Sequence, residues 1–134
     1  MRRLVFLVML LAGAFGCGKD SPTSPSSRPY SETMTGTVSA FGSTRHALSV
    51  PRNGQLTLRL TWSDAVDLDL YLASSACTTL YPRASCGVVA QSDGIGTNSE
   101  TIARTVTAGE QFSLWIDNLS LSRAATYTVT LSIP

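Results

Sequence analysis

Acidic side chains are the residues of this 134-residue chain whose types and spacing best suit metal chemistry. Asp67 and Asp69 lie two positions apart on a predicted strand, and Asp93 and Glu100 bracket a glycine-rich loop. Calcium takes about six to eight oxygen ligands, usually from loops beside strand ends. If the loop lies beside the strand, these four carboxylates converge on one Ca²⁺. The alternative is structural, since Asx side chains also cap turns and bond loop backbone, and the spacing, with Asp64 included, matches no defined calcium loop.

Two aromatic residues fall on the polar parity of their strands. Tyr71 alternates with leucines in Asp67-Leu-Asp-Leu-Tyr-Leu72, and Trp115 lies opposite in parity to Phe112, Leu114 and Ile116. Both are therefore predicted to face outward, where exposed rings stack on sugar rings or peptide side chains. The alternative is a cross-strand aromatic contact that covers the sheet.

Catalytic constellations are not evident. His46, the single histidine, has inward parity, which is typical of a structural residue, and no nucleophile elbow occurs. Asp67 and Asp69 as a hydrolase pair would point to the same side of one strand with no cleft implied. The sequence therefore predicts that the protein is not an enzyme.

The first residues have the pattern of a secretory signal. A positive start, Met1-Arg-Arg3, precedes an apolar run that is shorter than the ~20 residues needed to span a bilayer. The run ends at Gly16-Cys17 and so resembles a bacterial lipoprotein signal, a family in which the cysteine is acylated and becomes the new N-terminus. The resemblance implies a signal peptide over residues 1–16 and lipidation of Cys17. The alternative is cleavage after Ala12-Gly-Ala14, which leaves Cys17 as a free thiol.

Lipidation of Cys17 leaves Cys77 and Cys86 for each other. Export places them in an oxidising compartment, so the sequence predicts a Cys77–Cys86 disulfide, with two unpaired thiols as the alternative. Residues 17–29 are rich in serine and proline, which indicates an extended tether. The formal net charge is +1 and no basic cluster is visible, which argues against a nucleic-acid partner.

From Tyr30 onward the chain consists of short alternating segments separated by turn residues such as Pro51-Arg-Asn-Gly54. The pattern predicts an all-β fold over residues 30–134, an antiparallel two-sheet β-sandwich of about eight strands and no helix. Gly36 is a candidate bulge. The predicted strands cover residues 34–38, 46–50, 56–62, 67–72, 87–91, 101–106, 111–116 and 127–133.

Four motifs follow one another along residues 44–133: His46-x-Leu-x-Val50, Leu-x-Leu-x-Leu-x-Trp62, Asp67-Leu-Asp-Leu-Tyr-Leu72 and Tyr127-x-Val-x-Leu131. In this order they resemble the bacterial pre-peptidase C-terminal (PPC) domain. The resemblance implies a jelly-roll-like sandwich of the kind appended to exported enzymes. Some members bind collagen, polysaccharide or calcium.

Together these features predict an exported, lipid-anchored, non-catalytic binding or adhesion module of the bacterial envelope, on the outer membrane or cell surface rather than the inner membrane. Its partners would be the membrane and a glycan or protein that binds a sheet face. The alternatives are a structural envelope lipoprotein without a small-molecule ligand and, third, a small hydrolase.

Overall fold

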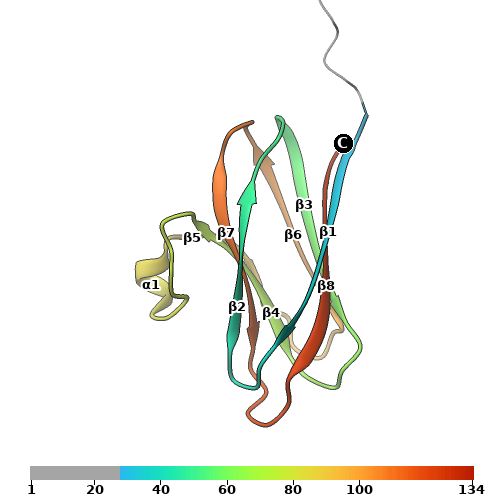
Figure 1. Ribbon diagram of the computed structural model, residues 1–134, viewed down its shortest axis with the longest axis vertical. Helices are drawn as coiled ribbons and strands as arrows, with labels where there is room; N and C mark the ends of the chain where they lie inside the picture. The colour runs from blue at the N-terminus through green and yellow to red at the C-terminus, as the bar shows by residue number, and fades with distance from the viewer. Residues whose placement is uncertain (1–27) are drawn as a thin grey trace, which may run out of the picture.

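A computed structural model describes residues 28–134 as two antiparallel four-stranded sheets packed face to face (Figure 1). The predicted all-β sandwich is confirmed. Among the described residues, no helix is long and apolar enough to cross a membrane. The elements are β1 (Tyr30–Val38), β2 (Ser43–Ser49), β3 (Gly54–Trp62), β4 (Leu68–Ser74), α1 (Arg83–Cys86), β5 (Val88–Ser92), β6 (Ser99–Val106), β7 (Gln111–Asn118) and β8 (Ala125–Ile133).

The strand order is that of a jelly roll. One sheet runs β1-β8-β3-β6 and the other β2-β7-β4-β5. The first strand pairs with the last, the second with the seventh, and so inward along the chain to β4 with β5. Such nested pairing of eight strands in two sheets is the jelly-roll pattern.

The core between the sheets follows the alternation of the sequence. Leu56, Leu58 and Leu60 of β3 are fully buried, and polar or charged side chains alternate with them. Fully burying one leucine contributes about 1.5–3 kcal/mol, so the inward rows of the strands supply most of the stabilisation. Partner rows come from Leu68, Leu70 and Leu72 on β4 and from Tyr127, Val129, Leu131 and Ile133 on β8.

Gly36 is not a bulge, contrary to the sequence prediction. It pairs in regular register with Tyr127, and a Cβ at this position would lie 2.5 Å from the tyrosine hydroxyl. Glycine is therefore needed for close approach of the ring. The same hydroxyl lies 2.7 Å from Nε2 of His46, which links β8 to the other sheet. His46 thus has the structural role that its parity predicted.

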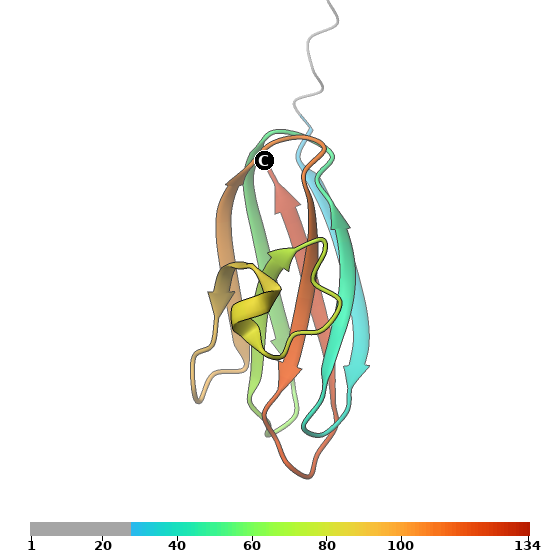
Figure 2. The ribbon, with the colours of Figure 1, turned by 90° about the vertical axis from the view of Figure 1, so that its left-hand side faces the viewer.

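A loop over residues 75–87 crosses the outer face of the second sheet, in front of β7 and β4 (Figure 2). It contains the four-residue helix α1, which the sequence prediction of no helix missed. The Cys77–Cys86 disulfide closes the loop, with 4.8 Å between the Cα atoms, and confirms the predicted pairing.

Asn118, at the end of β7, ties together two turns at the lower end of the sandwich in Figure 1. Its side-chain amide donates to the carbonyls of Ser39 and Arg123, and its side-chain oxygen accepts from the amide of Ser120. The amide of Phe41 also donates to the carbonyl of Ser120. These bonds fix the β1–β2 turn against the β7–β8 turn.

Candidate functional site

The prediction that Tyr71 and Trp115 lie exposed is wrong. They do point to the outer side of the sheet, but Tyr71 is 0% exposed and Trp115 is 5% exposed. The two residues are directly opposite in the β4–β7 register. The cross-strand contact was the alternative interpretation, and neither ring can stack on a ligand while the loop over residues 75–87 is in place.

A second, smaller apolar cluster accounts for this burial. Leu80 and the two disulfide cysteines of the loop pack against the outer side chains of β4 and β7. Trp115 has an indole N–H without a hydrogen-bond partner, so its contribution is apolar packing. The members of the cluster are Tyr71, Ala73, Cys77, Leu80, Cys86 and Trp115.

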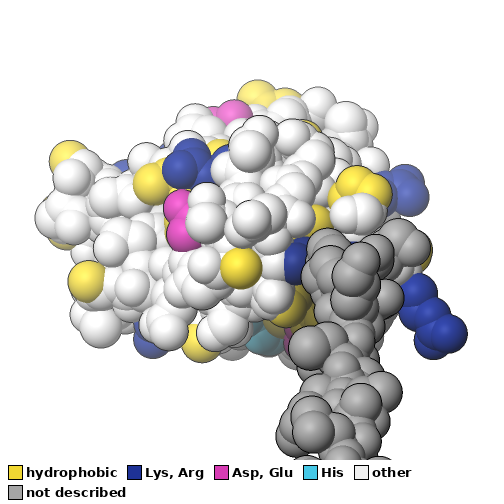
Figure 3. Space-filling view, turned by 90° about the horizontal axis from the view of Figure 1, so that it is seen from above, with side chains coloured by type: hydrophobic (Ala, Val, Ile, Leu, Met, Phe, Trp, Pro, Cys, Tyr) yellow, Lys and Arg dark blue, Asp and Glu magenta, His cyan; other side chains and the backbone are white. Residues whose placement is uncertain are grey.

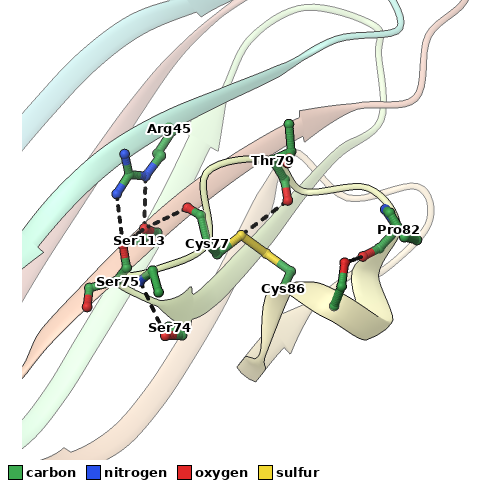
Figure 4. The surroundings of a disulfide bond; sticks show 10 residues. Arg45, Ser74, Ser75, Cys77, Thr79, Pro82, Cys86 and Ser113 are labelled. Carbon is green, nitrogen blue, oxygen red and sulfur yellow. Dashed lines mark hydrogen bonds between the residues drawn. A yellow bond between two sulfur atoms is a disulfide. The ribbon is translucent and has the colours of Figure 1, made fainter.

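Polar contacts fasten the first part of the same loop (Figure 4). Arg45 of β2 donates from Nε to the hydroxyl of Ser113 at 2.8 Å and from a terminal nitrogen to the carbonyl of Ser75 at 3.1 Å. Ser113 in turn donates to the carbonyl of Cys77 at 3.2 Å. The loop is therefore held by side chains from two strands as well as by its disulfide.

The four carboxylates predicted to converge on calcium do not form a metal-binding group. Among residues 28–134 no cluster of three or more histidine, cysteine, aspartate or glutamate side chains is arranged to hold a metal ion. Buried Glu100 accepts from the amide of Gly94 at 3.0 Å and the hydroxyl of Thr97 at 3.1 Å, which orders the β5–β6 loop. Asp93 is exposed and accepts from Gln91. The loop therefore places Glu100 in a buried environment and Asp93 in an exposed one, a difference that the linear sequence does not reveal.

Asp69 instead faces Asp117. They are register partners on the outer face of the sheet, and each is 3% exposed. Like charges directly opposite on a sheet destabilise it. Arg83 from α1 compensates, with its guanidinium 3.8 Å from Asp69 and 3.4 Å from Asp117. The disulfide loop thus supplies the cation that this carboxylate pair requires.

Two tyrosines complete the cluster around this arginine. The guanidinium carbon of Arg83 lies 4.4 Å from the ring centroid of Tyr71 and 5.3 Å from that of Tyr81. The Tyr71 hydroxyl donates to Asp69 at 2.7 Å, and the Tyr81 hydroxyl donates to Asp117. We call Asp69, Tyr71, Tyr81, Arg83 and Asp117 the arginine cluster.

Burial dominates the electrostatics of the arginine cluster. It raises the pKa of the Asp69 carboxyl, partly offset by the hydrogen bond from Tyr71. Burial and the bond to Asp69 raise the pKa of Tyr71, and burial followed by the bond to Asp117 raises the pKa of Tyr81. Both phenols are therefore neutral hydrogen-bond donors at physiological pH.

Beside the arginine cluster lies a hollow of about 340 Å³. Tyr81 and Asp117 belong to both features, so the hollow opens between the disulfide loop and the tied turns at the end of the sandwich. The remaining lining is mainly apolar or small, and it comes from the β1–β2 turn and the end of β7. The lining residues are Phe41, Gly42, Ser43, Tyr81, Asp117, Asn118 and Leu119.

Three of the residues that line this hollow, Phe41, Tyr81 and Leu119, have large exposed apolar or aromatic side chains. Phe41 is 73% exposed and Tyr81 is 54% exposed, and Leu119 and Leu121 of the β7–β8 turn are exposed as well. The opposite end of the sandwich presents apolar side chains singly among polar atoms (Figure 3). Contiguous exposed apolar surface marks interaction sites more often than scattered residues do.

Phe41 also has an unusual backbone. Its φ is +48°, and it is the one non-glycine residue with positive φ in the described part of the chain. A bulky L-residue in this left-handed region is strained by roughly 1–2 kcal/mol. The turn is fixed in this conformation by the hydrogen bond from the Phe41 amide to Ser120.

The hollow offers aromatic surface and one carboxylate in its lining, and the sequence predicts little of this arrangement. Asp117 shares the strand parity of Trp115, but nothing in the sequence distinguishes it as a site residue. Arg83 and Tyr81 sit inside the short cysteine loop, and Phe41 precedes a glycine in a turn. The available signal was an arginine and an aromatic residue between two paired cysteines.

Comparison with known proteins finds similarity in fold alone. No family model and no curated protein matches the chain. Aeromonas hydrophila PliG, a periplasmic lysozyme inhibitor of g-type lysozyme, is 10% identical with a TM-score of 0.54, over 78% of this chain and 86% of PliG. The Yersinia pseudotuberculosis-derived mitogen is 20% identical with a TM-score of 0.57, over 80% and 88%.

A third similar structure is the pre-peptidase C-terminal domain of a collagenase from Bacillus anthracis. It is 10% identical with a TM-score of 0.56, over 75% of this chain and 87% of that domain. The likeness to the PPC domain therefore holds at the level of fold. Fold does not determine function, so the site has to carry any functional argument.

Proposed function

We propose that this chain is an exported, lipid-anchored, non-catalytic module of the bacterial envelope that binds a protein partner through the hollow beside Phe41. The strained, exposed phenylalanine carries this proposal. The sheet face around Tyr71 and Trp115, which the sequence suggested for ligand binding, is covered. The contact surface therefore moves to the end of the sandwich.

Phe41 does little for the fold. A side chain that is 73% exposed gains little from apolar burial, and its left-handed backbone costs roughly 1–2 kcal/mol that glycine would avoid. Strained residues held by their surroundings gather at functional sites, and aromatic anchors dominate binding energy in protein interfaces. Burial of the ring by a partner would offset the cost of this backbone conformation, which burial within the fold does not.

The position of the hollow suits a tethered module. β1 begins at Tyr30, at the upper end of the sandwich in Figure 1, and the β1–β2 turn that carries Phe41 lies at the lower end. Nine residues of strand at ~3.3 Å each separate the two ends by roughly 30 Å. A chain anchored through Cys17 would present the hollow on the side away from its attachment.

The fold itself accommodates protein-binding roles, as the Aeromonas hydrophila lysozyme inhibitor illustrates. That likeness is an analogy between folds and names no partner for this chain. It favours a binding role over a catalytic one.

Two experiments test the proposal in cells that express the full chain. Labelled palmitate is expected to enter the wild type and not Cys17→Ser. A photo-cross-linking amino acid at Phe41 is expected to give an adduct of discrete mass. The same amino acid at Thr130, an exposed position on the outer face of the other sheet, serves as the control.

Each part of the proposal fails on a defined result. Equal palmitate labelling of both chains overturns the anchor at Cys17. Absence of an adduct from position 41, or the same adducts from positions 41 and 130, overturns the binding surface and favours a structural role for the domain.

A further inference from the structure

The hollow has an acidic floor, and this charge sets the chemistry of what it can receive. Of the residues that line it, Asp117 is the one with a carboxylate side chain, and no lysine or arginine lies among them. Asp69 lies opposite Asp117 in register, and the backbone carbonyl of Asp67 accepts from the amide of Leu119, another lining residue. The carboxylates of Asp117 and Asp69 therefore lie in or beside the floor.

One guanidinium, that of Arg83, faces two carboxylates and so compensates part of their charge. Arg83 interacts with Asp69 and Asp117 at 3.8 and 3.4 Å, longer than a charge-assisted hydrogen bond of about 2.7–2.9 Å. Two buried carboxylates beside one guanidinium leave an excess of formal negative charge, which favours a cation and disfavours an anion.

Arg83 also demonstrates what kind of cation fits these groups. Its guanidinium contacts the rings of Tyr71 and Tyr81 while it pairs with the aspartates. Planar guanidinium groups stack on aromatic faces more favourably than ammonium groups do. Tyr81 and Asp117 already bind one guanidinium, and both also line the hollow.

We infer that the hollow binds an arginine side chain of the protein partner, with its aliphatic stem against Phe41 and Leu119 and its guanidinium toward Asp117 and Tyr81. This inference rests on the proposed function, because it names the chemistry that the same surface recognises. The apolar wall matches the stem of arginine, which packs along apolar surface while its head stays polar. Lysine fits the charge but lacks the planar group.

The test compares two peptides that differ in charge but not in shape. One is an acetylated, amidated pentapeptide with a central arginine between leucines, and its twin has citrulline, a neutral isostere, at the same position. Each is titrated into the isotopically labelled full chain, purified as the cell processes it, while backbone amide shifts are recorded. We expect shifts at Phe41, Gly42, Asn118 and Leu119, and at least tenfold weaker binding of the citrulline peptide.

Two further conditions separate charge recognition from general stickiness. Raising the salt concentration is expected to weaken binding of the arginine peptide and to leave the affinity of the citrulline peptide unchanged, because only the charged contact is screened. Phe41→Ser, at an exposed position where the fold does not depend on the ring, is expected to abolish the shifts. Thr130→Ser on the distant sheet face is expected to leave them as in the wild type.

The outcomes distinguish this inference from the proposed function. Equal affinity of the twin peptides overturns arginine recognition, while an adduct from position 41 would still support a binding surface. No shift with either peptide, or shifts centred elsewhere, also overturns the inference. Absence of the adduct overturns the proposed function itself, whatever the peptides do.

Discussion

Removal of the Cys77–Cys86 disulfide is expected to loosen the loop that covers Tyr71 and Trp115. The bond joins residues nine apart in sequence. On the chain-entropy model, closing a loop of about ten residues stabilises the folded state by about 2.7 kcal/mol. The double variant Cys77→Ser/Cys86→Ser is therefore expected to lose about that much free energy of unfolding.

The loop is poorly supported by burial alone, so the loss should also be local. Ordering about ten residues costs at least ~10 kcal/mol of backbone entropy. Leu80, the fully apolar side chain that the loop buries in the small cluster, contributes about 1.5–3 kcal/mol. Hydrogen bonds from Arg45 and the contacts of Arg83 add about 1 kcal/mol each. With about 2.7 kcal/mol from the crosslink, the favourable terms come to within a few kcal/mol of the entropy cost, and without it the shortfall grows by that amount.

Urea unfolding and tryptophan quenching measure the two effects. With an m-value of about 1–3 kcal/mol/M, the urea midpoint is expected to fall by roughly 1–2.5 M. Trp62→Phe in all samples leaves Trp115 as the single tryptophan, and iodide is expected to quench it more strongly in the double variant. Cys17→Ser, which keeps the disulfide, is the matched control and should behave as the parent.

One result would refute this reasoning. If the double variant unfolds within about 0.5 kcal/mol of its parent and Trp115 stays equally protected from iodide, then side-chain packing holds the loop without the bond.

Three further variants test the cluster, the inter-sheet contact and the strained turn. Arg83→Met should lower the free energy of unfolding by about 1–2 kcal/mol at pH 7.5, discounted because Arg83 is partly exposed. The loss of unfolding free energy, measured in urea, should be smaller at pH 4. Burial raises the pKa of Asp69, so this carboxyl is protonated more readily than an ordinary aspartate and needs the arginine less. An equal loss at both pH values would contradict the idea that Arg83 compensates the charges of Asp69 and Asp117. Burial lowers the pKa of His46 below 6.5, so the unfolded chain takes up a proton first and thermal stability should fall as pH drops below 6.5. His46→Gln should flatten that slope, and an unchanged slope assigns it to other groups. Phe41→Gly should raise the free energy of unfolding by up to about 1 kcal/mol while it abolishes the cross-linked partner, and a loss of stability would show that the ring supports the fold.

Alternation along the strands predicted the fold well because it reports a local geometric fact. Successive side chains of a strand point to opposite faces, so the leucines at 56, 58 and 60 had to share one face. Strand ends were predicted less closely: β1 begins at Tyr30 and not near Met34, since polar residues such as Ser31 and Thr33 pair in register without burying a side chain.

The site could not be predicted in the same way, because each of its parts depends on contacts between distant segments. Parity correctly placed Tyr71 and Trp115 on the outer face, but parity carries no information about what covers that face. The prediction of a calcium site was wrong for the same reason. Glu100 accepts a hydrogen bond from its own loop, and Asp69 lies opposite Asp117.

The sequence by itself determined the alternating strands, their number and the pairing of Cys77 with Cys86, because period-two burial and cysteine count are properties of the linear chain. Tertiary structure alone decided that the carboxylates at 69 and 117 face each other and that Arg83 lies between two tyrosines. It also decided that the acidic stretch 67–69 ends beside a hollow with Phe41 at its edge. Charge and aromatic surface act over a few ångströms, and only the jelly-roll register brings β4, β7 and the disulfide loop within that distance.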